Sequence, residues 1–162
     1  MTSVLPKIKP VVALEVDNAN ASKRSWLSRL KLDHFRNYQQ ADLAIHAGQL
    51  VILGDNGAGK TNLLEAVSLL APGRGMRRAK TEHLAYRASG FDTSRGRADN
   101  DDDDRLDWAV AATLENEDGN VQIGTGVPQA AKQGNRIMRL EGVTVSQADL
   151  GSRLAVSWLT PQ

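Results

Sequence analysis

The chain has 162 residues, of which 41% are hydrophobic and 24% are charged, and its formal net charge is +1. This length allows one domain with a substantial core, and the composition is ordinary for a globular protein. The near-neutral charge gives no overall attraction to nucleic acid, so any such site must be a local basic patch. The sequence contains no cysteine, which excludes disulfides, cysteine-ligated zinc and thiol catalysis. No apolar run approaches the roughly 18 residues of a membrane span, and no signal peptide is visible, so we expect a cytoplasmic protein.

Residues 1–25 mix proline, asparagine, alanine and serine without a sustained period, and we interpret them as a flexible leader. A short strand over residues 11–16 is an alternative for part of this segment. The pattern changes at Trp26, where an ordered domain of residues 26–162 is expected to begin.

Two runs of alternating apolar and polar residues, 30–34 and 41–46, predict a β-hairpin. The turn Ala47-Gly48 then leads into residues 49–53. This short apolar run contains β-branched side chains and predicts a buried strand.

Residues 54–61 fit the phosphate-binding pattern G-x-x-x-x-G-K-[ST]. Its glycines lack a Cβ, so backbone N–H groups can turn inward and approach a phosphate closely. Lys60 is expected to reach the phosphates as a mobile point charge, and the Thr61 hydroxyl to ligate Mg²⁺ bound to them. The candidate nucleotide-binding residues are Gly54, Asp55, Asn56, Gly57, Ala58, Gly59, Lys60, Thr61 and Asn62.

A helix is predicted after this loop, because Leu63, Ala66, Val67 and Leu70 have the spacing of one helical face. The dipeptide Pro72-Gly73 is expected to end it. The positive end of the helix dipole points at the loop, where it favours bound anions. Strand, glycine-rich loop and helix therefore follow one another in the order that phosphate binding requires.

A basic cluster follows the predicted helix. Its members are Arg74, Arg77, Arg78, Lys80 and Arg87, and Glu82 is the acidic residue among them. Two interpretations stay open, a solvated surface loop and a site that contacts nucleotide or DNA phosphates.

Residues 90–105 form a low-complexity segment that ends in a run of aspartates. Like charges repel one another, so we expect a flexible acidic insert. Its spacing lacks the glycine and terminal glutamate of a calcium-binding EF-hand loop.

The remaining sequence is rich in predicted strands. They are residues 106–114, 121–123, 136–140, 143–145 and 155–159. Asp118-Gly119 and Glu141-Gly142 are hairpin-turn signals, and residues 124–135 are interpreted as a loop. Ser146 is expected to cap a short helix that ends near Leu150.

The sequence lacks parts that ATP hydrolysis requires. After residue 61, no run of four apolar residues ends in an aspartate or glutamate that could hold Mg²⁺. We therefore expect an incomplete domain, the first part of a longer protein, and whether this chain is an enzyme stays open.

Residues 30–38 and 54–66 together resemble the RecF family of bacterial DNA replication and repair proteins. Residues 73–77, 139–142 and 158–162 also look like segments of that family in the same order. The resemblance implies an α/β P-loop NTPase of ABC/SMC type. This chain would be its N-terminal lobe, with antiparallel strands around a strand–P-loop–helix unit.

The resemblance also implies ligands and roles. ATP and Mg²⁺ would be the cofactors, Arg36 and Asn37 would approach the nucleotide, and Gln162 would be a metal- and water-linked glutamine. The implied partners are single-stranded and gapped DNA at stalled forks, RecO, RecR, and a second copy in an ATP-dependent homodimer. ATP hydrolysis in the family is slow and acts as a release switch during the response to DNA damage.

Three alternatives remain. An ABC transporter ATPase subunit shares the glycine-rich loop, but residues 35–38 and Asn62 are foreign to that class. Another SMC-like repair protein would require a long heptad coiled coil. An inactive fragment would expose a sheet edge and apolar surface.

Overall fold

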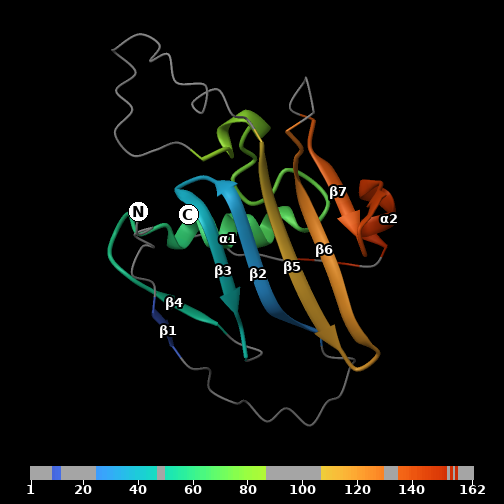
Figure 1. Cartoon of the computed structure of the whole chain (residues 1–162), viewed down its shortest axis with the longest axis horizontal. Helices are drawn as coiled ribbons and strands as arrows, with labels where there is room; N and C mark the ends of the chain where they lie inside the picture. Colours follow the sequence, from blue (N-terminus) through green and yellow to red (C-terminus); the bar gives the residue numbers. More distant parts are fainter. Residues whose placement is uncertain are drawn as a thin grey trace.

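An antiparallel sheet with the strand order β3-β2-β5-β6-β7-β8 dominates the part of the chain that the structure describes. The structure is a computed structural model, and it describes residues 9–11, 25–46, 50–86, 107–129, 135–152, 154 and 156. Helix α1 lies behind the sheet, and strands β1 and β4 form a separate two-stranded ribbon (Figure 1). The elements are β1 Lys9–Val11, β2 Trp26–Phe35, β3 Tyr38–Ala44, β4 Val51–Leu53, α1 Lys60–Leu69, the 3₁₀ helix η1 Thr81–His83, β5 Trp108–Asn116, β6 Gly119–Val127, β7 Ile137–Leu140, β8 Val143–Val145 and α2 Gln147–Gly151.

The first predicted hairpin is confirmed, with β2 and β3 joined by the two-residue turn Arg36-Asn37. Along β2, Leu30 and Leu32 are buried, while Lys31 between them is exposed. This alternation places one face of the sheet against α1 and the other in solvent.

The later hairpins are confirmed as well. Strands β5 and β6 pair along their whole length, and β7 pairs with β8 around the turn Glu141-Gly142. Glu141 has φ 50° and Gly142 has φ 78°, the left-handed conformations that two-residue hairpin turns of type I′ require. The predicted cap is also present, because the Ser146 hydroxyl accepts a hydrogen bond from the Asp149 amide at 3.1 Å.

The prediction of a loop over residues 124–135 is wrong at its start, because β6 continues through Val127. The glycine, glutamine and proline residues of this stretch suggested a loop, but one of its glycines allows close strand packing. A Cβ on Gly126 would lie 2.3 Å from the carbonyl oxygen of Trp108 on β5. A glycine inside a strand often marks such a close backbone approach.

The strand before the glycine-rich loop is present but is not buried. Val51 and Leu53 of β4 are 53% and 52% exposed. Among the described residues, β4 pairs only with β1, and no second layer covers both of its faces. A continuous apolar run is typical of strands covered on both faces, which is why the sequence suggested burial.

Part of the expected leader forms a strand. Lys9–Val11 is β1 and pairs antiparallel with β4. It shares only Val11 with the alternative strand expected at residues 11–16, and residues 12–16 lie outside the described residues. The proline at position 10 is compatible with an edge strand. The rest of the leader, the insert at residues 90–105, most of the strand predicted at 155–159 and Gln162 lie outside the described residues.

The core joins α1 to the sheet through large side chains. Phe35 at the end of β2 and Trp108 at the start of β5 are buried, with ring centroids 5.5 Å apart in an edge-to-face arrangement. The Trp108 indole N–H donates a hydrogen bond to the Thr81 carbonyl at 3.2 Å. Leu63 and Leu69 of α1 are buried in the same core.

Arg136, which directly precedes β7, links this part of the sheet to the C-terminal end of α1. Its guanidinium donates hydrogen bonds to the carbonyl oxygens of Leu69 and Gly73, both at 2.5 Å, and to the Thr125 hydroxyl at 2.7 Å. A positive side chain at the C-terminus of a helix satisfies carbonyls that have no helical partner and interacts favourably with the dipole. Burial lowers the pKa of Arg136 from its ordinary value.

We expect Gly126→Ala to lower the free energy of unfolding by about 1–3 kcal/mol, because the new methyl group would press on the β5 backbone. Gly124→Ala is the matched control in the same strand. Its Cβ would lie 3.7 Å from the Val110 carbonyl oxygen, an ordinary contact. Urea denaturation of both variants measures the difference, and equal midpoints would contradict the close packing of β5 and β6.

We expect Arg136→Ala to destabilise the chain by about 2–3 kcal/mol, because it leaves several carbonyls at the end of α1 without a charged donor. Arg139→Ala removes the same charge from an exposed position on β7 and should change stability by less than about 0.5 kcal/mol. Thermal unfolding of the two variants under identical conditions is the measurement, and a similar loss in both would refute the capping role.

Candidate nucleotide-binding site

The glycine-rich loop connects β4 to α1, as the motif predicts. Gly57 and Gly59 have φ values of 84° and 98°, in the left-handed region that favours glycine. The Ala58 amide donates to the Asp55 carbonyl at 3.1 Å, which closes the first turn of the loop. Residues 54–57 are exposed, so this part of the loop is open to solvent.

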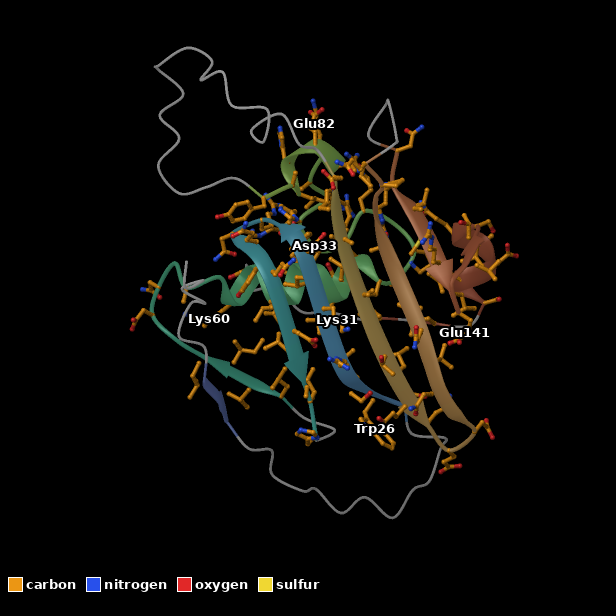
Figure 2. All side chains as sticks on the ribbon, in the orientation of Figure 1. Trp26, Lys31, Asp33, Lys60, Glu82 and Glu141 are labelled. Atoms are coloured by element: carbon orange, nitrogen blue, oxygen red, sulfur yellow. The ribbon has the colours of Figure 1, made fainter. Side chains whose placement is uncertain are left out.

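Lys60, the first residue of α1, folds its side chain back across the loop. Its ammonium donates hydrogen bonds to the carbonyl oxygens of Gly54 at 2.6 Å and Asp55 at 2.7 Å. Figure 2 shows Lys60 at the end of α1 near β4, on the opposite side of the molecule from Glu141. The cation and the N-terminus of α1 therefore bring positive charge to the same place.

The turn between β2 and β3 packs directly against the end of this loop. A Cβ on Gly59 would lie 2.5 Å from Asn37 Nδ2 and 2.7 Å from Tyr38 Oη, so the position has no room for a side chain. The Tyr38 hydroxyl donates to the Gly59 carbonyl at 3.2 Å. Burial raises the pKa of Tyr38 to about 12.

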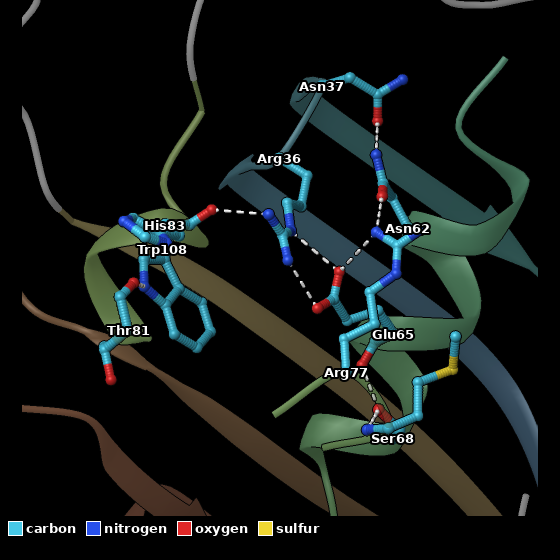
Figure 3. Close-up of polar contacts among 10 residues, drawn as sticks. Arg36, Asn37, Asn62, Glu65, Ser68, Arg77, Thr81, His83 and Trp108 are labelled. Carbon is cyan, nitrogen blue, oxygen red and sulfur yellow. Dashed lines mark hydrogen bonds and ion pairs between the residues drawn. The ribbon is translucent and has the colours of Figure 1, made fainter. Parts of the chain in front are cut away.

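Asn62 links the same turn to the basic cluster. Its side-chain amide donates to Asn37 Oδ1 at 2.8 Å, and its own Oδ1 accepts from Arg77 Nη1 at 3.1 Å. Figure 3 shows these three side chains in one chain of hydrogen bonds. Asn37 and Asn62, both predicted site residues, are therefore brought together by the fold.

Glu65 lies at the centre of the network, one helical turn after Asn62, and is only 1% exposed. Arg36 grips its carboxylate with two hydrogen bonds, from Nε to Oε2 at 2.9 Å and from Nη2 to Oε1 at 2.7 Å. Arg77 adds a third contact to Oε2 at 3.4 Å (Figure 3). One carboxylate thus faces two guanidinium groups, which leaves a net positive charge beside the first turns of α1.

Arg36 adopts an unfavourable backbone conformation to make this contact. Its φ is 56°, in the left-handed region, which costs on the order of 1 kcal/mol for a residue with a side chain. Its amide donates to the Leu84 carbonyl at 2.8 Å, and its Nη1 donates to the His83 carbonyl at 2.9 Å. These bonds and the Glu65 pair hold the turn in place.

Two residues of the site, Tyr38 and Glu65, had no role predicted from the sequence. They lie within the segments that resemble RecF, but nothing in the pattern assigned them a contact. Glu65 stands three residues after Asn62 and four before Leu69, so a helical projection places all three on adjoining rows. A glutamate beside the apolar face of the helix could have indicated that Glu65 is buried in an ion pair.

Thr61 is exposed at the start of α1, and among the described residues its hydroxyl has no hydrogen-bond partner. A free hydroxyl oxygen suits a hard cation such as Mg²⁺, which prefers oxygen ligands.

Among the described residues, no three His, Cys, Asp or Glu side chains form a group that could bind a metal ion. No helix in the described part of the chain combines the length and apolar character needed to cross a membrane.

We expect Glu65→Gln to destabilise the chain by about 3 kcal/mol, because removing one partner of a buried ion pair leaves the other charges uncompensated. Glu82→Gln is the matched control, since Glu82 is exposed and its carboxylate lies 3.8 Å from Lys80 Nζ and 3.8 Å from His83 Nε2. That change should cost less than about 1 kcal/mol. Urea denaturation of both variants distinguishes the two cases, and a small effect at both positions would contradict a structural role for Glu65.

Comparisons with known proteins identify relatives of this chain. The RecF/RecN/SMC N terminal domain matches residues 26–162. DNA replication and repair proteins RecF from Rhizobium johnstonii, Mesorhizobium japonicum and Agrobacterium fabrum are 46%, 43% and 42% identical over 83%, 85% and 83% of this chain. The matched regions are 32%, 33% and 32% of those proteins, so the chain spans about a third of the length of these curated relatives.

Solved structures support the fold. The recombination mediator protein RecF-ATP in the RecFOR pathway matches 83% of this chain and 32% of that chain with a TM-score of 0.58 at 22% identity. The SMC head domain from Thermotoga maritima matches 80% of this chain and 42% of that chain with a TM-score of 0.50 at 16% identity. The predicted fold class, part of an ABC/SMC-type P-loop domain with an antiparallel lobe, is confirmed.

The resemblance to RecF that residues 30–38 and 54–66 indicated is also confirmed, because each of these curated relatives carries that name. The family match covers the hairpin, the glycine-rich loop, α1 and the rest of the sheet. The chain therefore belongs to the RecF/RecN/SMC N terminal domain family.

Proposed function

We propose that this chain is the phosphate-binding part of a RecF-type protein that binds ATP and acts in DNA replication and recombinational repair. The observation that carries the proposal is the open glycine-rich loop, which the β2–β3 turn holds against the N-terminus of α1 through Tyr38 and Asn37. A loop braced in this way keeps its amide groups and Lys60 near one point in space. Curated relatives named RecF, at up to 46% identity, supply the biological context.

Each predicted residue then has a distinct task. The backbone amides of residues 54–59 would surround the β-phosphate, and the Lys60 ammonium would exchange its two carbonyl contacts for phosphate oxygens. The Thr61 hydroxyl would hold Mg²⁺, which neutralises phosphate charge when bound. Asn62 and Asn37 would line the approach to the phosphates, and Arg36 acts mainly through Glu65.

The wider activity follows from the family and belongs to the longer protein. We propose that it binds DNA at gaps and stalled forks, forms a homodimer when ATP is bound, and works with RecO and RecR in the cytoplasm. Gln162 would contribute to the metal site in that setting. Hydrolysis would depend on an acidic residue at the end of a later apolar strand, and after the loop no run of four apolar residues ends in aspartate or glutamate.

The alternatives receive less support. The curated relatives described above are RecF proteins, and none of them is a transporter subunit. The likeness to an SMC head, at 16% identity, concerns the fold alone. An inactive fragment is the remaining alternative, and nucleotide binding by this chain would exclude it.

We expect Mg-ATP at a hundred times its dissociation constant to stabilise the chain by about 2.7 kcal/mol. For a domain of this size, that corresponds to a rise in melting temperature of about 5–10 °C. Lys60→Ala should abolish the rise, because it removes the cation that reaches the phosphates. Differential scanning calorimetry with and without Mg-ATP is the measurement.

Lys31→Ala is the control for loss of one positive charge. Lys31 is exposed on β2, between the buried residues Leu30 and Leu32, and should leave the nucleotide-dependent shift intact. A cooperative melt with no shift in the unmodified chain would refute nucleotide binding by this part of the protein alone.

A further inference from the structure

The segment that follows α1 is built as a fixed surface rather than a loose connection. We call residues 72–78 the arginine loop. Arg136 holds the Gly73 carbonyl at 2.5 Å, Gln147 accepts a hydrogen bond from the Gly73 amide at 3.1 Å, and the Ser68 hydroxyl accepts one from the Met76 amide at 2.9 Å. The backbone of the arginine loop is therefore anchored at three places, by the residue that precedes β7, by α2 and by α1.

The conformation of the arginine loop is set by packing. Gly73 and Gly75 have φ values of 101° and 67°, and a Cβ on Gly75 would lie 2.9 Å from both Leu69 Cδ2 and Ser68 Oγ. Arg78 also has a positive φ, 51°, although it carries a side chain. Residues held in such conformations persist where the surroundings over-determine them, which is common at functional surfaces.

The basic residues of this region divide into two groups. Arg77 is committed to Asn62 and Glu65, and Lys80 lies 3.8 Å from Glu82. Arg74 and Arg78 are exposed, and neither side chain has a hydrogen-bonding or ionic partner among the described residues. Among the four members of the basic cluster that the structure describes, two guanidinium groups are thus free, and Arg87 lies outside the described residues.

The two free arginines flank a hollow in the surface. Its lining comprises Pro72, Gly73, Arg74, Gly75 and Arg78. Among the described residues, none with a carboxylate lines this hollow, so the charge of its lining comes from the two arginines. In a chain whose formal net charge is only +1, such a patch concentrates the attraction for a polyanion at one place.

We propose that Arg74 and Arg78 bind neighbouring phosphates of a nucleic-acid backbone. Guanidinium groups bind phosphate oxygens in a bidentate manner. Because the backbone of the arginine loop is already anchored, binding does not have to pay the entropy cost of ordering it. No atom lies within 4 Å of the place where a Cβ on Gly73 would stand, so a phosphate can approach the loop closely there. The proposal rests on the proposed function, because it assigns the DNA contact of that protein to two named residues.

The position of the loop separates this contact from the nucleotide. The arginine loop follows the C-terminal end of α1, whereas Lys60 begins it. At about 1.5 Å of rise per residue, the two ends of this ten-residue helix lie about 15 Å apart. DNA binding and ATP binding can therefore be measured as separate properties of the same variants.

The test is the salt dependence of DNA binding by the full chain, measured by fluorescence anisotropy. The probe is a labelled duplex of arbitrary sequence with a single-stranded gap, titrated between about 50 and 200 mM salt. Replacing both residues (Arg74→Ala with Arg78→Ala) should reduce the slope of log K against log salt by about 2, one unit for each lost phosphate contact. Arg74→Lys with Arg78→Lys should keep the slope and lose only part of the affinity, because it retains the charge without the bidentate geometry.

Arg139→Ala is the matched control, an exposed arginine on β7 that projects from the strand between Met138 and Leu140, and it should leave the slope unchanged. An equal effect at Arg139, no effect of the double alanine variant, or no DNA binding by the unmodified chain at low salt would each overturn the proposal. Competition by polyglutamate as strong as that by unlabelled DNA would also overturn it, in favour of an acidic protein partner.

The Mg-ATP melting shift of the double alanine variant separates the two levels of inference. A normal shift with an unchanged DNA slope refutes only the arginine-loop proposal. If the unmodified chain shows no rise in melting temperature with Mg-ATP, the proposed nucleotide binding is refuted, whatever the DNA result.

Discussion

The burial of Glu65 is the constraint on which the rest of the site depends. Moving a carboxylate out of water costs several kcal/mol, and only close, well-directed partners offset that cost. Arg36 is such a partner, but it reaches the carboxylate only if the β2–β3 turn sits on α1. The ion pair therefore requires the hairpin and the helix to dock in a single arrangement, and that arrangement brings Tyr38 and Asn37 to the glycine-rich loop.

Helix α1 is fixed at both ends by groups from the sheet. At its N-terminus the β2–β3 turn contacts Gly59 and Asn62, and at its C-terminus Arg136 holds the last carbonyls. The two anchors come from opposite ends of the strand order, since β2 lies near one edge and Arg136 directly precedes β7. The helix is thus positioned by the whole width of the sheet rather than by a single neighbour.

Local sequence patterns predicted most of the helices and strands. The features that these patterns failed to predict depend on contacts between residues that are distant in the sequence. The hairpins, the glycine-rich loop, α1 and the Ser146 cap follow from alternation, spacing and turn chemistry, all of which act within a few residues. Gly126 was misread because its reason is the backbone of Trp108, a residue from another strand. The roles of Glu65 and Arg136 were equally hidden, because a charged side chain has no local signal that it will find its partner across the fold.

The pairing of β2 with β5 carries a consequence for how the chain acquires its structure. The β2–β3, β5–β6 and β7–β8 pairs are hairpins whose strands are neighbours in sequence, whereas Asp33 of β2 pairs with Ala109 of β5 after the chain has passed through α1. Contacts between distant segments form only after a large loss of chain entropy, and they slow folding. We therefore expect the closing of the β2–β5 seam to limit the folding rate and to join the hairpins into a single cooperative sheet.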